Sequence, residues 1–301
     1  MTTSSLRALI AIATYLRPDD LTLLLTSLEP QATEHGAHVI VVDNDAAGSA
    51  RAIAEASPVV TEYVIEAEPG IAQARNRALD VFDDRYDVII FVDDDEWADP
   101  DWLGCLLGYM DASGSDIVLG AVYTQLPPDA PGWIHNGGYL QRGVPPTGTD
   151  CPSAATNNTA VRRTAWLGVG SPRFDTSYSV TGGSDTQFFQ TLTERGLTIR
   201  FVAEAIVHES TPPERLRMRW VARRLMRNGI VAGRVMGERQ GRRAVRRHGW
   251  REIRSGIRLI AGDVRHRRTL GAISTRTLLI GVGEVYSTFG GRIHEYKRPQ
   301  G

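Results

Sequence analysis

Short apolar runs alternate with helical patterns through the first 120 residues of the chain. A strand that is buried on both faces has a continuous apolar sequence, and strands that alternate with helices form a parallel sheet covered by helices on both sides. We therefore expect an α/β fold with a parallel sheet covered by helices on both faces. The five expected strands are residues 7–13, 38–43, 60–66, 87–93 and 116–122.

The charge distribution divides the 301-residue chain into two parts. Residues 1–213 hold 12 basic and 29 acidic side chains, whereas residues 214–301 hold 22 and 6. We expect a main α/β domain over the first part and an Arg-rich helical region over the second, with different partners for the two. Residues 124–158 contain six prolines and interrupt the main domain, which favours a lid or binding loop.

The cysteines and the apolar segments indicate where in the cell the protein is located. Cys105 and Cys151 are far apart and outside any C-x-x-C motif, which favours a reducing, cytoplasmic compartment over a disulfide framework or a zinc site. The apolar stretch at 272–290 is interrupted by Arg276 and Glu284. No membrane-spanning helix is expected.

The expected strand 87–93 runs directly into Asp93, Asp94, Asp95 and Glu96. Two carboxylates about 4 Å apart repel each other by roughly 4 kcal/mol at an effective dielectric near 20, and a cation removes that penalty. Strand alternation would point Asp93 and Asp95 to one side and Asp94 to the other, so the first two could share Mg²⁺ or Mn²⁺. The alternative is a solvated acidic turn that caps the next helix.

Two further charged residues stand where ligands bind in such folds. Asp43 ends the strand 38–43, at the edge where open α/β sheets hold their ligands, although it could equally form a turn. Arg75 lies near the start of a helix that follows a Pro-Gly turn. Its guanidinium can meet a phosphate or a base edge, or can simply face solvent.

A third candidate precedes an apolar helical run. Ser184 and Gln187 form a capping-box pattern, which places Asp185 at the first helical position, where the helix dipole favours its ionised form. Asp185 could therefore serve as a base or only as part of a helix cap. His208 follows a short apolar run and is either a metal ligand or a structural hydrogen-bonding residue.

In their order and spacing, these motifs resemble a family 2 glycosyltransferase with the GT-A fold, most closely the bacterial exopolysaccharide enzymes of the succinoglycan biosynthesis type. The resemblance covers most of the chain. The motifs are TYLRP (14–18), VVDND (41–45), GIAQARN (70–76), FVDDDEWADPDWL (91–103), GGSDTQFF (182–189) and FGGRIHEY (289–296). The sequence departs from the family at Leu16, where Asn is common, and at Ser184, where Glu is usual.

The resemblance implies that residues 1–213 are a GT-A catalytic domain, built on a Rossmann-like, mixed but mostly parallel sheet flanked by helices. It further implies a nucleotide-sugar half (1–122) and an acceptor-side half (123–213). The implied donor-binding residues are Thr14, Tyr15, Arg17, Asp43, Arg75, Asp93 and Asp94. The implied ligands of Mn²⁺ or Mg²⁺ are Asp95, Asp93 and His208. Asp185 is the implied general base, which takes the proton from an acceptor hydroxyl.

The implied activity is the inverting transfer of a sugar from a nucleoside diphosphate, with a UDP-sugar favoured, to a hydroxyl group. The acceptor is a glycan, a lipid-linked glycan or a small secondary metabolite. A sugar nucleotidyltransferase needs a glycine-rich, lysine-bearing loop after the first strand, and residues 14–20 contain neither feature. Trp133, in the proline-rich segment, could stack on a sugar or anchor the loop.

Residues 215–236 predict a basic amphipathic helix, which could lie on an anionic membrane surface at the inner face of the cell membrane. The alternative is a solvated face packed on the acidic domain. A non-catalytic protein that binds nucleic acid or lipid would also use such a region. Between Arg215 and Arg268 the only aromatic residues are Trp220 and Trp250, which argues against nucleic acid. The sequence does not indicate an oligomeric state.

Overall fold

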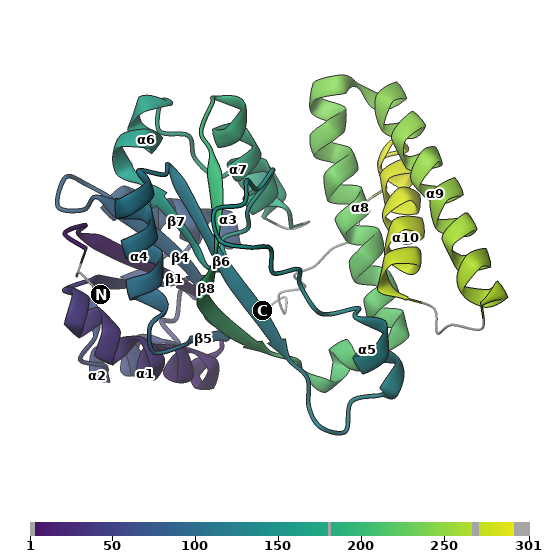
Figure 1. Cartoon of the computed structure of the whole chain (residues 1–301). Helices are drawn as coiled ribbons and strands as arrows, with labels where there is room; N and C mark the ends of the chain where they lie inside the picture. Colours follow the sequence, from purple (N-terminus) through teal and green to yellow (C-terminus); the bar gives the residue numbers. More distant parts are fainter. Residues whose placement is uncertain (1–3, 180–181, 267–270, 292–301) are drawn as a thin grey trace. The chain divides into compact units, whose positions relative to one another are not determined.

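The computed structural model describes residues 4–179, 182–266 and 271–291. The end of the predicted C-terminal region, including residues 292–296 of the last motif, lies outside this range. The chain forms two compact units (Figure 1). The sheet unit comprises residues 1–123, 142–179 and 184–210, and the helical unit comprises residues 124–141, 180–183 and 211–301.

The sheet unit is built on an eight-stranded sheet with the order β3-β2-β1-β4-β7-β6-β8-β5. Its first four strands are parallel, whereas β7 pairs antiparallel with β4 and β6, and β5 pairs antiparallel with β8. The mixed, mostly parallel sheet is confirmed, and all five expected strands are present. The strands are β1 (Ala8–Thr14), β2 (His38–Asp43), β3 (Val60–Ile65), β4 (Val88–Asp93), β5 (Glu96–Ala98), β6 (Ile117–Gln125), β7 (Thr159–Arg162) and β8 (Ile199–Ser210).

Helices cover both faces of the sheet, because alternate residues of each central strand point to opposite sides. In β1, Ile10 and Ile12 join a core with α1 (Pro18–His35), α2 (Arg51–Ala56) and α4 (Trp102–Ser113). Leu9 and Ala11 join a second core with α3 (Ile71–Val81), α6 (Arg163–Gly168) and α7 (Ser184–Glu194). The short helix η1 (Thr176–Tyr178) lies between α6 and α7 in the chain.

A buried asparagine links α4 to the sheet. The Asn158 Oδ1 atom accepts a 2.7 Å hydrogen bond from Trp102 Nε1, and its Nδ2 atom donates to the backbone oxygens of Ala121 and Ala205, both at 2.8 Å. Asn158 is fully buried and has φ of 71°, a left-handed conformation that asparagine enters more readily than most residues. One side chain therefore ties together three separate segments of the core.

Replacing Asn158 by Ala is expected to destabilise the protein by about 3 kcal/mol or more, since each buried partner left unbonded costs about 1–3 kcal/mol. The measurement is the free energy of unfolding in urea. Asn158→Gly is the matched control: it loses the same hydrogen bonds but tolerates the positive φ, so the difference between the two variants isolates backbone strain. An Asn158→Ala protein within about 0.5 kcal/mol of wild type, the usual range for surface substitutions, would contradict this account.

The helical unit confirms the predicted helical C-terminal extension. Its elements are α5 (Gly132–Gly137), η2 (Pro213–Leu216), α8 (Met218–Gln240), α9 (Arg242–Arg265) and α10 (Ala272–Ser287). Helix α10 packs on both α8 and α9 (Figure 1). His248 Nδ1 and Glu284 Oε2 form a 2.7 Å contact between α9 and α10, and burial raises the pKa of Glu284 while the bond to His248 lowers it. Within the described residues, no helix has the length and apolar character needed to cross a bilayer.

Part of the proline-rich segment belongs to the helical unit. Ile134 and Leu140, from and just after α5, form a small core with Val221 and Leu225 of α8. Trp133 is partly buried against this core, and its ring meets that of Tyr139 edge-on at 5.4 Å between centroids. Trp133 thus has the packing that a loop anchor requires.

Candidate functional site

The register of the parallel strands gathers the predicted donor residues at one edge of the sheet. Thr14, the last residue of β1, pairs with Asp43 at the end of β2, and Ala13 pairs with Asp93 at the end of β4. Each of these strands points its carboxyl end to the same edge. The sheet therefore brings together polar and charged side chains that are far apart in sequence, such as Thr14 and Asp94, which are 80 residues apart.

Asp94 and Asp95 share one guanidinium. The Arg17 Nη1 atom lies 2.9 Å from Asp94 Oδ1 and 3.1 Å from Asp95 Oδ2, and Thr14 Oγ1 donates a 2.8 Å hydrogen bond to Asp94 Oδ2. Burial raises the pKa of Asp94 to about 6, against the opposing effect of Arg17. The predicted alternation, with Asp93 and Asp95 on one side and Asp94 on the other, is therefore not observed. The reason is that β4 ends at Asp93 and the chain turns before β5.

Asp93 has a different arginine. Its Oδ1 atom lies 3.1 Å from Arg75 Nη2, and the Arg75 side chain is largely buried, at 11% exposure. Burial raises the pKa of Asp93, Arg75 opposes this rise, and the carboxylates of Asp95 and Asp185 add to it. Asp185 thus lies within electrostatic range of the acidic strand end. The structure brings Asp93, Asp94, Asp95, Arg17, Arg75 and Asp185 into one region of the sheet unit.

Asp43 makes bonds typical of a turn-forming residue. It is fully buried, and its two carboxylate oxygens accept hydrogen bonds from the backbone N–H groups of Asp45 (3.0 Å) and Ala50 (2.7 Å) and from the Tyr63 hydroxyl (2.8 Å). These bonds shape the loop that follows β2. The neighbouring Asn44 bonds the backbone of Glu66, Glu68 and Gly70, which fixes the entry to α3.

Sequence reasoning missed the role of Glu96. Its side chain is almost fully buried beneath the strand end, where one oxygen accepts the Asp93 N–H at 3.1 Å and the other accepts from Asn157 Nδ2 at 3.3 Å. Burial raises the pKa of Glu96 well above its usual value, and Asp93 adds to the rise. Arg142, which lies 3.0 Å from Glu209, opposes the rise in the pKa values of Asp93 and Glu96. Only the run of four acids hinted at Glu96 in the sequence.

Helix α7 presents Asp185 differently from the predicted cap. The helix begins at Ser184, and Gln187 Nε2 donates to Thr191 Oγ1 at 3.1 Å, while its Oε1 atom has no hydrogen-bond partner among the described residues. The predicted capping box is therefore wrong, because the Gln187 side chain extends toward the C-terminal end of the helix. Asp185 is half-buried in the first turn, where its Oδ1 atom accepts the Thr186 N–H at 2.7 Å.

His208 lies on β8, opposite Trp97 of β5. Its ring stacks on that indole at 5.4 Å between centroids, and its Nε2 atom lies 2.7 Å from Asp99 Oδ1. Asp99 is not one of the predicted metal ligands. Tyr15, the remaining predicted donor residue, is half-buried directly after β1. The next residue, Leu16, has φ of 53°, a left-handed conformation that asparagine adopts more readily than leucine.

The chemistry of the acidic strand end fits a hard divalent cation, since all its ligand atoms are carboxylate oxygens. In the described residues, however, no group of three or more His, Cys, Asp or Glu is arranged to hold a metal. Mg²⁺ is commonly held by one or two carboxylates together with phosphate oxygens of a substrate. Asp93 and Asp95 therefore fit a metal that is completed by the substrate.

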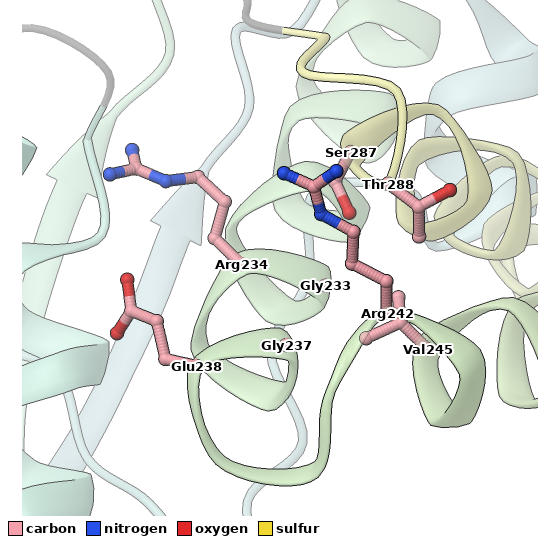
Figure 2. A pocket seen from close by; sticks show the side chains of 8 residues that line it. All are labelled: Gly233, Arg234, Gly237, Glu238, Arg242, Val245, Ser287 and Thr288. Atoms are coloured by element: carbon pink, nitrogen blue, oxygen red, sulfur yellow. The ribbon is translucent and has the colours of Figure 1, made fainter.

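A pocket of about 240 Å³ occurs in the helical unit, where α8, α9 and the end of α10 meet (Figure 2). It is lined by Gly233, Arg234, Gly237, Glu238, Arg242, Val245, Ser287 and Thr288. Arg246 Nε donates a 3.0 Å hydrogen bond to Thr288 Oγ1 beside it. None of the predicted donor, metal or base residues lines this pocket, so it is not part of the candidate site.

Comparison with known proteins identifies relatives in sequence and in structure. The family model described as Glycosyl transferase family 2 matches residues 9–166. The Succinoglycan biosynthesis protein ExoM of Rhizobium meliloti (strain 1021) is 37% identical over 242 residues, which are 76% of this chain and 75% of that protein.

The similar solved structures have low sequence identity. TarS 1–349 of S. aureus has a TM-score of 0.56 at 16% identity, and the match covers 95% of this chain and 92% of the TarS 1–349 chain. GalNAc-T7, solved with UDP, GalNAc and Mn²⁺, has a TM-score of 0.53 at 13% identity over 68% of this chain. The chain spans 44% of GalNAc-T7 and 43% of a longer TarS chain. Because the family model covers more than half of the chain and ExoM shares 37% identity, this protein belongs to glycosyl transferase family 2, and it has the GT-A fold.

Proposed function

We propose that this protein is an inverting, metal-dependent glycosyltransferase that moves a hexosyl group from a nucleoside diphosphate to an acceptor hydroxyl. The observation that carries the proposal is the acidic strand end, where Asp93, Asp94 and Asp95 meet two arginines at the carboxyl edge of the parallel strands. Open α/β sheets bind their ligands at this edge. Membership of glycosyl transferase family 2 supports the reaction class.

The proposed donor is a UDP-sugar. TarS 1–349 was solved with UDP-GlcNAc, and GalNAc-T7 was solved with UDP, GalNAc and Mn²⁺. The proposed donor-binding residues are Thr14, Tyr15, Arg17, Asp43, Arg75, Asp93 and Asp94. Arg17 and Arg75 bring positive charge to the sheet edge, and their planar guanidiniums suit phosphate oxygens.

The proposed cofactor is Mn²⁺ or Mg²⁺, held by Asp95 and Asp93 together with phosphate oxygens of the donor. His208 is proposed as a further ligand, although the described residues do not group it with the two carboxylates. When bound, the cation would stabilise the negative charge that develops on the leaving diphosphate. Arg17 already neutralises part of the carboxylate charge in this region. The carboxylates and the guanidiniums together form an edge that can receive a diphosphate and its counterion.

Asp185 is the proposed base. It takes the proton from the acceptor hydroxyl as that oxygen attacks the anomeric carbon on the face opposite the diphosphate. The bond from the anomeric carbon to the phosphate oxygen breaks in the same step, the electron pair leaves with the nucleoside diphosphate, and the configuration inverts. No covalent bond between the sugar and the protein is required.

The proposed acceptor is a growing glycan or lipid-linked glycan in exopolysaccharide biosynthesis, in line with the 37% identity to the succinoglycan biosynthesis protein. Such an acceptor places the protein in the cytoplasm, where nucleotide sugars are available, with peripheral contact to the membrane. A transfer assay with radiolabelled UDP-sugars and isolated lipid-linked acceptors tests this part of the proposal.

The donor site is tested by calorimetric titration of UDP, GDP, CDP and dTDP, with and without Mn²⁺. We expect one nucleotide, UDP, to bind in a metal-dependent way. We expect Asp95→Ala to weaken that binding by about tenfold or more, equivalent to roughly 1.4 kcal/mol, because the variant loses a carboxylate ligand.

The matched control is Asp111→Ala, which removes the same charge from an exposed position on α4 and should bind as wild type does. If folded wild-type protein binds none of the four nucleotides, the donor site is wrongly assigned. If Asp95→Ala retains full metal-dependent affinity, Asp95 is not a metal ligand.

A further inference from the structure

Helix α9 has one face that packs inward. Val245, Gly249 and Gly256 are buried on this face. A Cβ atom at Gly249 would lie 2.9 Å from the backbone oxygen of Gly281, and one at Gly256 would lie 2.6 Å from the backbone nitrogen of Leu278. Helices α9 and α10 therefore approach each other closely at these two glycines, whereas Val245 lies beside Gly237 of α8 and lines the pocket there.

A second face of α9, about 100° around the helix from the two buried glycines, exposes large apolar side chains. Trp250, Ile257 and Val264 are 52%, 55% and 65% exposed. Residues spaced by seven lie close to one line along an α-helix, because seven residues make nearly two turns. These three side chains thus form an exposed apolar stripe along the helix.

Arginines accompany this stripe, and the acids of α9 are kept away from it. The exposed arginines of the helix are Arg242, Arg243, Arg246, Arg247, Arg251, Arg254, Arg258 and Arg265. Its two acids lie toward α10: Asp263 accepts a 2.7 Å hydrogen bond from Ser274, and the Cβ atom of Glu252 lies 2.8 Å from where a Cβ would stand on Gly281. Within the described part of the chain, no carboxylate pairs with Arg247, Arg254 or Arg258.

The exposure of the apolar residues favours α9, and not the segment 215–236, as the helix that could lie on a membrane surface. In α8, the apolar residues Val221, Leu225, Ile230 and Val235 are buried. The apolar side of α8 is therefore already occupied by protein. On α9, by contrast, the apolar stripe is exposed and is accompanied by exposed arginines.

We propose that the outer face of α9 lies on an anionic phospholipid surface, with Trp250, Ile257 and Val264 at the boundary between head groups and acyl chains. The flanking guanidiniums then bond head-group phosphates, and each basic residue near such a surface contributes about 1 kcal/mol. A nucleic acid would satisfy the arginines but would leave Ile257 and Val264 in water. This inference does not depend on the donor or the acceptor proposed above.

The test is co-sedimentation of the full chain with vesicles, without nucleotide or acceptor. We expect binding to vesicles of equal parts phosphatidylcholine and phosphatidylglycerol, and none to phosphatidylcholine alone. The triple variant Arg247→Gln/Arg254→Gln/Arg258→Gln should lower the affinity by about 100-fold, the equivalent of three contributions of roughly 1 kcal/mol each. The variant Trp250→Ser/Ile257→Ser should also weaken binding, even at constant charge.

The matched control is Arg51→Gln/Arg85→Gln/Arg195→Gln, which removes three exposed arginines from the sheet unit and should bind vesicles as wild type does. Equal losses in both triple variants would overturn the proposal, because binding would then follow net charge and not this face. No binding by wild type would also overturn it. Calorimetry with UDP on the same proteins separates either failure from a failure of the donor site.

Discussion

Replacing Asp185 by Asn is expected to abolish sugar transfer while leaving donor binding nearly unchanged. The substitution preserves the shape of the side chain, and the amide cannot take the acceptor proton. General-base catalysis contributes about 10²- to 10⁴-fold to a rate, so the turnover number should fall by that factor. Transfer assays give the rate, and calorimetry with UDP and Mn²⁺ gives the donor affinity of the same protein.

Glu194→Gln is the control for this experiment, since it removes one carboxylate from the far end of the same helix, α7. It should retain wild-type transfer. If Asp185→Asn loses donor binding as completely as it loses transfer, Asp185 binds the donor and is not the base. If the variant transfers sugar at the wild-type rate, the base is another residue.

The parallel strands were predictable because burial on both faces makes them continuously apolar. β1, β2 and β4 have this property, and each has an acidic or polar residue at its carboxyl end. The antiparallel part was harder to predict. β5 is only three residues long and begins inside the acidic run, and β7 is four residues long and follows the proline-rich segment. Such strands are defined by the partners they pair with, and no local pattern reveals them.

The candidate site was predictable as a set of residues, but its pairings were not. A run of acids at a strand end predicts repulsion that something must relieve, yet it does not say which arginine approaches which carboxylate. Arg17 meets Asp94 and Asp95 because the chain turns after Asp93. Glu96 turns inward to hold the Asp93 N–H group. These details depend on the turn between β4 and β5, which the alternation rule does not describe.

The helical unit depends on glycines at which two backbones meet. A Cβ atom at Gly283 of α10 would lie 2.1 Å from the backbone oxygen of Met226 and 3.0 Å from the Cα atom of Gly229 on α8. Backbone atoms cannot move aside as a flexible side chain can. The contact between α8 and α10 therefore requires a residue without a side chain at this position.

Gly283→Ala is accordingly expected to destabilise the helical unit by about 2 kcal/mol or more, because overpacking costs about 1–3 kcal/mol, and more where the obstacle is rigid. This loss outweighs the roughly 1 kcal/mol by which alanine favours a helix over glycine. Thermal unfolding and limited proteolysis measure the effect, and cleavage within α8 and α10 should become faster.

Gly262→Ala on α9 provides the control, since a Cβ atom there would have no neighbour within 4 Å among the residues that the structure describes. It should gain up to about 1 kcal/mol from helix propensity alone. Stability changes of opposite sign in the two variants would show that close packing, and not helix propensity, determines the effect of substituting Gly283. If both variants gained stability, α8 and α10 would not approach at this glycine, and the packing of α10 between its two neighbours would have to be revised.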